Sequence, residues 1–422
     1  MELQLMHCYK QESVIGGGIN SLIQSGGKLT IDRQCEFNQC SSWGGGGGIY
    51  ADISGMNSLL LQEDGVKFEG CLSDGEGAGG GIYIDIHDQG KCIINKVQLN
   101  NCNAYFQGGG ICVNGDDNMK QTLNGTQFTN CETEYQGGGM LANINSENSI
   151  LELIGVIFEN CTSIFTGGGL NVEVNLGASL LTSGTCLFKN CSTQILGGGC
   201  YVFCTDIGSI FSMTGELEFE NCTSMISGGM QLSVSDQSTV DINQVSFKNC
   251  SAEYEGGLGV TISYEGVFSI SGSASFDNCE SNYNAGGFYL EFNGLYNNVQ
   301  ISGQLEFENC TSDIGGGMQF DIYNYTTVDI NQIFVKNCLA GKQGGGQFVS
   351  IQDGGVFSIC GSAFLNCDSQ NGGGIFSDIN DGTLNCIPPL IIEVQFSNSS
   401  SPVIENILPI SVKNTQNPPP KI

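Results

Sequence analysis

One phrase organises this sequence: Phe-x-Asn-Cys followed by a cluster of glycines, which returns about every 30 residues. Its cysteine occupies thirteen positions, separated by 28 to 32 residues, namely Cys8, Cys40, Cys71, Cys102, Cys131, Cys161, Cys191, Cys222, Cys250, Cys279, Cys310, Cys338 and Cys367. A degenerate fourteenth unit has Ser399 in the cysteine position. A repeat of this length is typical of solenoids, whose units bury an apolar face only by stacking on one another.

Within each unit, apolar and polar residues alternate with a period of two. Residues 230–235, for example, read Met-Gln-Leu-Ser-Val-Ser, and residues 239–247 continue the alternation. This period is that of a strand, and the intervening Gly, Asn, Asp and Ser residues are turn formers. About three short strands per unit, without helices between them, predict an all-β fold. We therefore expect a right-handed parallel β-helix of about 13–14 rungs, with roughly 30 residues per rung.

The composition changes near residue 387, and this change sets the predicted boundaries. All 7 prolines lie at or after Pro388, and the glycine triplets end at Gly374. We assign residues 1–387 to the β-helix repeat domain, residues 388–413 to an irregular last rung and C-terminal cap, and residues 414–422 to a proline-rich tail or linker. The first unit has no recognisable cap. Exposed strand edges there predict an earlier start of the native chain, a covering element, or end-to-end self-association.

The three recurring residues have different predicted roles. Phenylalanine lies on the inward phase of the alternation and should form a stacked column. The asparagine two residues later should form a bend in the left-handed conformation, with its side-chain amide hydrogen-bonded from rung to rung. This bend turns the next residue, cysteine, inward, where it packs as a small apolar side chain.

The cysteine column is predicted to be reduced, with scattered disulfides as the alternative. In-register neighbours keep their Cβ atoms about 4.8 Å apart, beyond the usual ~3.5 to 4.5 Å of a disulfide. Zinc is not expected, because the remaining cysteines have no C-x-x-C spacing and no nearby histidine pair. These remaining cysteines are Cys35, Cys92, Cys112, Cys186, Cys200, Cys204, Cys360 and Cys386.

The chain is strongly acidic, with 43 Asp and Glu against 13 Lys and Arg and a formal net charge of −30. This charge repels nucleic-acid phosphates and anionic lipids, so no nucleic-acid partner is expected. An apolar content of 40% is enough for a folded core. The sequence predicts no membrane-spanning helix, and its opening residues do not resemble a secretory signal. We expect an extracellular or cell-surface location if a signal lies upstream of this segment, and an intracellular location otherwise.

Two familiar motifs are better explained by the repeat. The glycines within residues 75–80 (Gly75, Gly77 and Gly80) fit G-x-G-x-x-G, but no helix pattern and no Walker lysine follow them. We interpret the glycine clusters as a stacked corner that needs positive φ or close backbone approach. Five of the eight N-x-S/T triplets contain repeat asparagines. Only Asn124, Asn324 and Asn398 are therefore plausible glycosylation acceptors, and only in a secreted chain.

The phrase Gly-Gly-Gly-Ile-Tyr, at residues 46–50 and 79–83, occurs together with Phe-x-Asn-Cys. The combination resembles the GGA[ILV] and FxxN repeats of chlamydial polymorphic outer membrane proteins and related protist surface proteins, within the pectate-lyase-like right-handed β-helix superfamily. The similarity covers about residues 8–400. Glycine replaces the family's alanine, cysteine stands where asparagine is expected, and no membrane barrel follows. The resemblance implies a passenger-type surface or adhesion role, and its short motifs are more specific for fold than for partner.

No catalytic residue set is recognised in the sequence. The superfamily that this chain resembles includes polysaccharide lyases, which need an Arg or Lys base beside calcium-binding carboxylates. Arg33 has no acidic cluster next to it. His7 and His87, the two histidines, lie in no nucleophile–base pattern. Carboxylates brought together between rungs remain the alternative. That hypothesis requires an exposed groove with three or more converging carboxylates within about 10 Å.

Two acidic clusters, expected in turns, are candidate calcium ligands: Asp116, Asp117 and Asn118, and separately Asp378, Asn380 and Asp381. Hard oxygen ligands suit calcium, but neither cluster completes an EF-hand loop or a G-G-x-G-x-D nonapeptide. Ordinary acidic turns are the alternative. Apart from calcium, no cofactor is expected. Asp241 and Asp329 should point outward, and repulsion among such carboxylates predicts greater stability in salt or divalent cations.

A longer repeat bears on function. Residues 303–312 copy residues 215–224 almost letter for letter, so about three rungs were duplicated together. Such copying suits an extending rod better than a catalytic centre. The first hypothesis is a non-catalytic, elongated surface or adhesion protein that binds a protein or glycan along one face. The alternatives are a carbohydrate-active enzyme, lyase or glycoside hydrolase, on the same fold, and an intracellular assembly component, which reduced thiols would suit.

Overall fold

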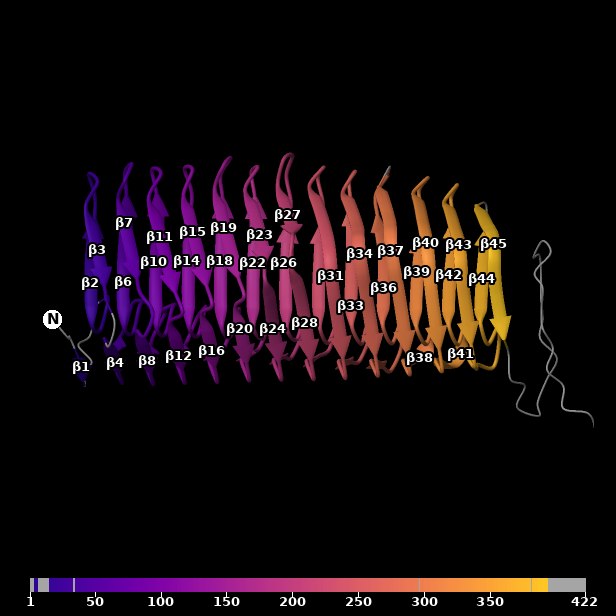
Figure 1. The fold of residues 1–422 in the computed structure, drawn as a ribbon, viewed down its shortest axis with the longest axis horizontal. Coiled ribbons are helices and arrows are strands. Elements are labelled where there is room, and N and C mark those ends of the chain that lie inside the picture. The colour runs from indigo at the N-terminus through magenta and orange to yellow at the C-terminus, as the bar shows by residue number, and fades with distance from the viewer. Residues whose placement is uncertain (1–3, 7–14, 33–34, 296, 381, 394–422) are drawn as a thin grey trace, which may run out of the picture.

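The chain forms a long stack of similar coils, which Figure 1 shows from the side in a computed structural model. The structure describes residues 4–6, 15–32, 35–295, 297–380 and 382–393. These residues form a parallel β-solenoid of about 12 turns with about 30 residues per turn, and they contain no helix. The prediction of an all-β parallel β-helix is confirmed. The units of Cys8 and Ser399 lie outside the described residues, which accounts for the higher count expected from the sequence.

The described strands form three parallel sheets of 21, 13 and 11 strands, here named A, B and C. Sheet B contains β2 (Ile19–Ile23), β6 (Ile49–Ser54), β10 (Ile82–His87), β14 (Ile111–Gly115), β18 (Met140–Asn145), β22 (Leu170–Asn175), β26 (Cys200–Cys204), β30 (Met230–Val234), β33 (Leu258–Ser263), β36 (Phe288–Asn293), β39 (Met318–Ile322), β42 (Gln347–Gln352) and β44 (Ile375–Asn380). Sheet C contains β5 (Ser41–Ser42), β9 (Leu72–Ser73), β13 (Asn103–Ala104), β17 (Glu132–Thr133), β21 (Thr162–Ser163), β25 (Ser192–Thr193), β29 (Thr223–Ser224), β32 (Ser251–Ala252), β35 (Glu280–Ser281), β38 (Thr311–Ile314) and β41 (Leu339–Gln343).

Sheet A is the largest because most coils contribute two strands or one long strand to it. It contains β1 (Gln4–Met6), β3 (Lys28–Ile31), β4 (Glu36–Asn38), β7 (Leu59–Gln62), β8 (Lys67–Glu69), β11 (Lys91–Asn95), β12 (Gln98–Asn100), β15 (Lys120–Asn124), β16 (Gln127–Thr129), β19 (Ile150–Ile154), β20 (Ile157–Glu159), β23 (Ser179–Ser183), β24 (Thr185–Lys189), β27 (Ile210–Met213), β28 (Glu216–Glu220), β31 (Thr239–Lys248), β34 (Val267–Asp277), β37 (Asn298–Glu308), β40 (Thr327–Lys336), β43 (Val356–Leu365) and β45 (Thr383–Glu393). Gly125 and Gly155, both at positive φ, separate the two strands in early coils. From β31 onward the two strands merge into one of 10 or 11 residues.

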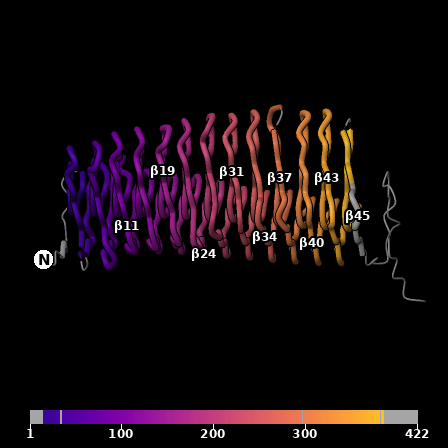
Figure 2. The backbone as a smooth tube through the Cα atoms, turned by 45° about the horizontal axis from the view of Figure 1, so that its top comes forward, coloured from indigo at the N-terminus to yellow at the C-terminus, as the bar shows by residue number. Residues whose placement is uncertain are grey.

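Each coil passes from sheet B to sheet A and then to sheet C, and the next coil follows the same path beside it, as the tube in Figure 2 shows. Neighbouring strands pair in parallel and in register. Phe128, for example, lies opposite Phe158, which lies opposite Phe188. Because the register is kept from coil to coil, each inward position of the repeat becomes a column running along the solenoid.

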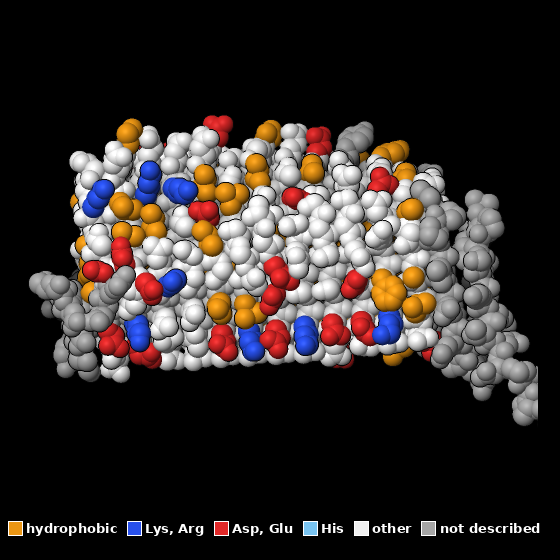
Figure 3. Space-filling model, viewed as in Figure 1, with side chains coloured by type: hydrophobic (Ala, Val, Ile, Leu, Met, Phe, Trp, Pro, Cys, Tyr) orange, Lys and Arg blue, Asp and Glu red, His pale blue; other side chains and the backbone are white. Residues whose placement is uncertain are grey.

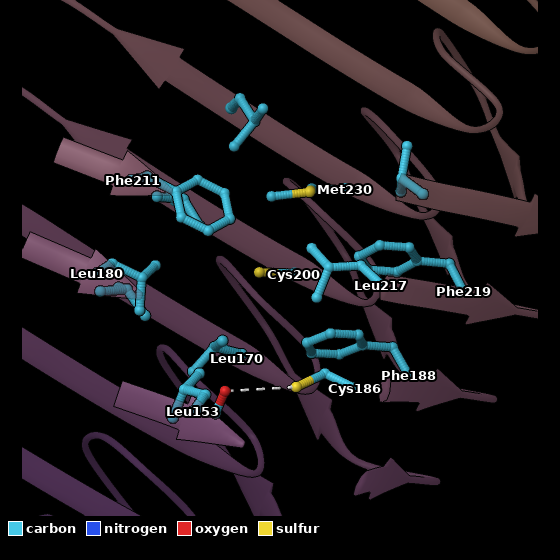
Figure 4. Close-up of a cluster of buried hydrophobic side chains, with 14 of the residues drawn as sticks. Leu153, Leu170, Leu180, Cys186, Phe188, Cys200, Phe211, Leu217, Phe219 and Met230 are labelled. Atoms are coloured by element: carbon cyan, nitrogen blue, oxygen red, sulfur yellow. Dashed lines mark hydrogen bonds between the residues drawn. The ribbon is translucent and has the colours of Figure 1, made fainter. Parts of the chain in front are cut away.

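The predicted aromatic column is present in the core. Phe158, Phe188 and Phe219 are buried and stack nearly parallel, with ring centroids 4.9 and 4.7 Å apart. Figure 4 shows Phe188 and Phe219 one above the other, with Leu217 and Met230 in the same interior. Leu99 stands in this column between Phe68 and Phe128, so the aromatic stacking is interrupted there. Burial of these side chains is the main force that holds one coil against the next.

The recurring asparagines adopt the predicted bend. Asn160, Asn190 and Asn221 have φ values of 54°, 52° and 55°. Each side-chain amide donates to the side-chain oxygen of the asparagine one coil earlier, for example Asn190 to Asn160 at 3.0 Å and Asn221 to Asn190 at 3.0 Å. The asparagine therefore adopts the left-handed backbone conformation that the bend requires. Its side chain takes part in a hydrogen-bonded ladder along the edge between sheets A and C.

The cysteine after each bend points inward, as predicted. Cys161 and Cys191 are buried, and the Cys191 thiol donates to the backbone carbonyls of Phe158 and Lys189 at 3.5 and 3.6 Å. The column cysteines from Cys71 to Cys367 are free thiols, and burial raises the pKa of Cys191. A raised pKa leaves little reactive thiolate at Cys191.

The glycine clusters form the corner between sheets C and B. The first glycine of a triplet, such as Gly137, has a positive φ of 66°. The second is enclosed by backbone: a Cβ atom on Gly138 would lie 2.3 Å from the carbonyl oxygens of Gly168 and Thr162. Both parts of the predicted explanation therefore apply, left-handed conformation at the first glycine and close backbone approach at the second.

The last described strand, β45, crosses the boundary expected at residue 387. It pairs with β43 from Thr383 to Glu393, and its register shifts where Pro388 and Pro389 lie opposite Gly361. Proline cannot donate to a ladder, so a local irregularity is expected at this point. The predicted cap beyond residue 393 and the tail at 414–422 lie outside the described residues.

Candidate ligand-binding face

The outward side chains of sheet B form the most polar yet least basic surface of the described solenoid. In each strand the second and fourth residues point outward, opposite the inward first, third and fifth residues. We call these positions the outer face of sheet B. They are Asn20, Leu22, Tyr50, Asp52, Tyr83, Asp85, Cys112, Asn114, Leu141, Asn143, Asn171, Glu173, Tyr201, Phe203, Gln231, Ser233, Gly259, Thr261, Tyr289, Glu291, Gln319, Asp321, Phe348, Ser350, Phe376 and Asp378.

Charge is distributed unequally between the sheets. No described strand of sheet B contains a lysine or arginine, whereas lysines occur repeatedly in sheet A, at Lys28, Lys67, Lys91, Lys120, Lys189, Lys248 and Lys336. Three of these lysines pair with acids of neighbouring coils: Lys120 with Glu152, Lys189 with Glu220 and Lys336 with Glu308, at 3.8, 3.2 and 2.6 Å. A row of alternating acidic and basic side chains crosses the lower part of the view in Figure 3. The acids on sheet B have no such lysine partners.

The second position of the outer face points away from the core but is buried in most described coils, at Cys112, Leu141, Asn171, Gln231, Gly259, Tyr289, Gln319 and Phe348. It lies beside the corner where sheet C turns into sheet B, and the corner residues form a ladder of parallel bridges, for example Gln107 to Gln136 and Gln136 to Thr166. Leu141 on this face packs with other apolar residues against the corner. Asn171 donates its side-chain amide to the hydroxyl of Thr166. The corner thus covers one edge of the face and lowers the local dielectric constant.

Exposed aromatic side chains follow the same corner. Phe106, Tyr135 and Phe165 form one ring cluster, with centroids 4.8 and 5.3 Å apart. Farther along, the rings of Tyr254 and Tyr283 lie 5.2 Å apart and are 37% and 47% exposed. We call these residues the aromatic corner. Rows of accessible rings next to buried polar groups are typical of binding surfaces rather than of a solvated edge.

At the N-terminal end of the face, the polar side chains satisfy each other. Asp85 accepts hydrogen bonds from the hydroxyl of Tyr50 at 3.1 Å and from the amide of Asn114 at 3.3 Å. His87 lies 3.0 Å from Asp52 across neighbouring strands. His87 therefore takes part in a side-chain contact between neighbouring coils on this face. His7 and Arg33 lie outside the described residues.

At the C-terminal half of the face, three polar side chains converge above a glycine. A Cβ atom on Gly259 would lie 1.9 Å from Glu255 Oε2, 2.1 Å from Ser227 Oγ and 2.3 Å from Gln231 Oε1. The Ser227 hydroxyl lies within hydrogen-bond distance of both Glu255 and Gln231. The Gln231 amide nitrogen donates to the carbonyl of Leu232 at 3.3 Å, which orients its oxygen toward the serine.

The contacts of Ser227 bear on the protonation of Glu255. Ser227 has one hydroxyl hydrogen, and the oxygens of Glu255 and Gln231 both approach it. If Ser227 donates to Gln231, the Glu255 carboxyl must donate to Ser227. Burial, with a smaller contribution from the nearby charge of Glu291, raises the pKa of Glu255 to about 7 against the opposing hydrogen bond from Ser227. A neutral carboxyl near pH 7 fits both observations.

Next to this cluster, two carboxylates lie side by side. Glu291 on β36 and Asp321 on β39 are register partners. Asp321 accepts hydrogen bonds from the Tyr289 hydroxyl and the Gln319 amide, each at 2.9 Å. Burial raises the pKa of Asp321, and burial together with the charge of Asp321 raises that of Glu291. The face therefore holds three electrostatically coupled carboxyl groups, counting Glu255.

The two predicted calcium candidates lie in different kinds of element, and their calcium role stays a prediction. Asp116, Asp117 and Asn118 lie just before β15, with φ values of 50° and 61° at Asp117 and Asn118, as turn residues do. Asp378 and Asn380 lie in strand β44, not in the expected turn, because sheet B extends through them; Asp381 lies outside the described residues. In the described part of the chain, no group of three or more His, Cys, Asp or Glu is placed to hold a metal ion.

Sequence reasoning missed Glu255, Glu291 and Asp321, although a signal was present. In three successive coils the first glycine of the corner triplet is replaced, by Ser227, Glu255 and Ala285. Ser227 keeps the left-handed φ of 58° that glycine normally adopts there. A side chain held in glycine's conformation is strained, and such local exceptions occur preferentially at functional positions.

Comparison of the chain with models of known protein families and with curated proteins finds no match. The described residues include no helix long and apolar enough to cross a membrane. The assignment of a function to this protein therefore rests on its fold and on the outer face of sheet B.

Proposed function

We propose that the protein is a non-catalytic, elongated scaffold of surface or adhesive type, which binds a glycan along the outer face of sheet B and the aromatic corner. The observation that carries this proposal is the unequal distribution of charge. Lysines pair with acids on sheet A, whereas the strands of sheet B carry six outward acids and no lysine or arginine among the described residues. A surface kept free of cations favours a neutral or cationic ligand.

The chemistry of the face favours a glycan over an anionic or purely apolar partner. Carboxylates and side-chain amides accept hydrogen bonds from hydroxyl groups, and tyrosine rings supply apolar contact next to them. Both kinds of group recur at the spacing of the coils, about 4.8 Å. A linear polymer of repeating hydroxylated units matches this arrangement, and the net charge of −30 opposes polyanions.

Binding of the purified protein to a panel of neutral, cationic and anionic oligosaccharides tests the proposal. Replacing Tyr254 and Tyr283 together by Ala should weaken binding about tenfold or more, because each ring loses buried apolar area. The matched control replaces Tyr264 and Tyr325 by Ala; these tyrosines are each 65% exposed and lie on the turns between sheets B and A. Equal losses in the two double variants, or no binding to any oligosaccharide, contradict the proposal.

A carbohydrate-active enzyme is the second candidate, and one observation favours it. Burial raises the pKa of Glu255 to about 7, so a large fraction is protonated at neutral pH, while Glu291 and Asp321 lie close enough to influence it or each other. A protonated acid near ionised carboxylates is the pairing that glycosidic cleavage uses. Release of reducing ends from the bound oligosaccharide, abolished in Glu255→Gln, would establish this candidate. If the oligosaccharide is unchanged after prolonged incubation, the enzyme candidate is rejected and the proposal of a non-catalytic scaffold stands.

A further inference from the structure

Two similar polar groups lie on the outer face of sheet B, and only one is satisfied internally. In the first group, Asp85 accepts hydrogen bonds from Tyr50 and Asn114, and Asp52 is paired with His87. In the second, Glu291 and Asp321 occupy the same strand position in neighbouring coils. Within the described residues, no lysine, arginine or histidine pairs with either carboxylate.

The second group presents hydrogen-bond acceptors without matching donors. The two donors nearby, Tyr289 and Gln319, both donate to the same oxygen of Asp321. Gln319 is 6% exposed, and its Oε1 has no hydrogen-bond partner among the described residues. Glu291 forms no hydrogen bond to any described side chain. A buried acceptor without a donor costs about 1–3 kcal/mol, so this group is incomplete as it stands.

Two tyrosines flank the acceptors. Tyr289 lies two residues before Glu291 on the same face of β36, and Tyr323 lies two residues after Asp321. Burial, followed by the charges of Asp321 and Glu291, raises the pKa of Tyr323 to about 12. Aromatic rings beside carboxylates stabilise an organic cation by their negative faces. A metal ion fits less well, because the described residues provide no set of three acidic, histidine or cysteine ligands here.

We propose that Tyr289, Glu291, Gln319, Asp321 and Tyr323 form a binding site for a primary ammonium group carried by an amino sugar. An ammonium group has three N–H donors, which matches acceptors supplied by Glu291, Asp321 and Gln319. Its charge offsets two neighbouring carboxylates that lack a cation. The assignment of the carrier as a sugar rests on the proposed function, whereas the ammonium site itself does not.

Calorimetric titration with glucosamine, N-acetylglucosamine and n-butylamine tests the inference. Glucosamine should bind more tightly than n-butylamine, and N-acetylglucosamine, which has no ammonium group, should bind at least about tenfold more weakly than glucosamine. The double variant Glu291→Gln/Asp321→Asn should lose glucosamine binding by at least about tenfold. The matched control Asp241→Asn/Asp329→Asn removes two outward carboxylates from sheet A, outside the proposed binding face, and should bind glucosamine normally.

Each other outcome has a defined meaning. Equal losses in the two double variants overturn the site, because they assign binding to the general acidity of the molecule. Equal affinity for glucosamine and n-butylamine overturns the sugar as carrier. If oligosaccharides bind equally well with and without amino groups, the ammonium site is overturned but the proposed function stands. If glucosamine binds but no oligosaccharide does, the ammonium site stands and the proposed function is overturned. If the double variant does not fold, Glu291→Gln alone gives the same readout.

Discussion

At the scale of the residue, the corner glycines and their replacements decide where chemistry can occur on this solenoid. A glycine at the first corner position costs nothing at positive φ, and most coils keep it. Ser227 and Glu255 take this position in two successive coils, and their oxygens meet above Gly259, where most other coils have a larger side chain. One replaced glycine and one missing side chain together make room for a buried polar cluster.

The Glu255 carboxyl should make stability depend on pH. Its pKa is raised to about 7 by burial, so the folded state retains a proton that the unfolded chain releases near pH 4.5. The resulting stabilisation is fully present below about pH 4.5 and is lost as the pH rises through about 7. In Glu255→Gln this loss, roughly 3 kcal/mol at most, should be absent. Chemical denaturation at a series of pH values checks this; parallel pH profiles of the two proteins would refute the assignment.

Gly138→Ala should destabilise the solenoid strongly. The new Cβ atom would lie 2.3 Å from two backbone carbonyl oxygens of the next repeat unit, those of Thr162 and Gly168, and neither can move without breaking a ladder. We expect a loss of about 2–4 kcal/mol in the free energy of unfolding, as for other overpacked backbone positions. Gly155→Asn is the control, because the nearest atom is 3.8 Å from its Cβ position and asparagine tolerates positive φ. Similar losses in both variants would contradict the steric explanation.

At the scale of the element, the asparagine ladder is what converts a strand into a coil. Each asparagine ends the second strand of sheet A at a left-handed residue and turns the next residue, cysteine, into the core. The ladder amides both donate and accept, so one side chain supports the bends of two neighbouring coils. This explains why the bend residue is an asparagine and not a glycine in most of the described coils.

Asn190 provides a test of this role. Asn190→Ala removes one donated and one accepted hydrogen bond and places alanine at a φ of 52°. We expect a loss of about 2–4 kcal/mol, from two hydrogen bonds of about 1 kcal/mol and a backbone cost of about 1–2 kcal/mol. Asn190→Gly relieves the backbone and should lose only the hydrogen-bond share. Thermal or urea denaturation compares them; an alanine variant no less stable than the glycine variant would argue against left-handed strain.

At the scale of the whole molecule, the negative net charge opposes folding, and the placement of lysines offsets it only on some surfaces. Sheet A distributes lysines among its acids, whereas the described strands of sheet B contain acids but no lysine or arginine. Asp241 and Asp329 point outward on sheet A as the alternation predicted. A formal charge of −30 on one elongated body must be self-repelling.

The melting temperature should therefore rise with ionic strength. Going from about 10 mM to 150 mM salt shortens the Debye length from about 30 to about 8 Å, which screens repulsion between coils. Millimolar calcium should add to this effect if carboxylates of neighbouring coils share it. A melting temperature that does not respond to salt would show that repulsion between coils contributes little to stability.

The internal repeat was sufficient to predict the inside of the solenoid. Inward positions are fixed by the two-residue alternation and by the register of identical units, so the phenylalanine, cysteine and asparagine columns follow from counting along the sequence. The prediction that Asp378 and Asn380 lie in a turn was wrong, because turn-forming residue types also occur in strand β44. Local composition does not distinguish the two cases.

The sequence by itself determined the coil, its period and its core, because a strict repeat in register makes every inward contact a copy of the one before. The tertiary structure alone decided which outward side chains meet. Glu255, Glu291 and Asp321 are separated by about 30 residues and belong to no common motif, and their proximity depends on how the corner covers sheet B. Their protonation depends on burial, which is a property of the packed surface and not of any single coil.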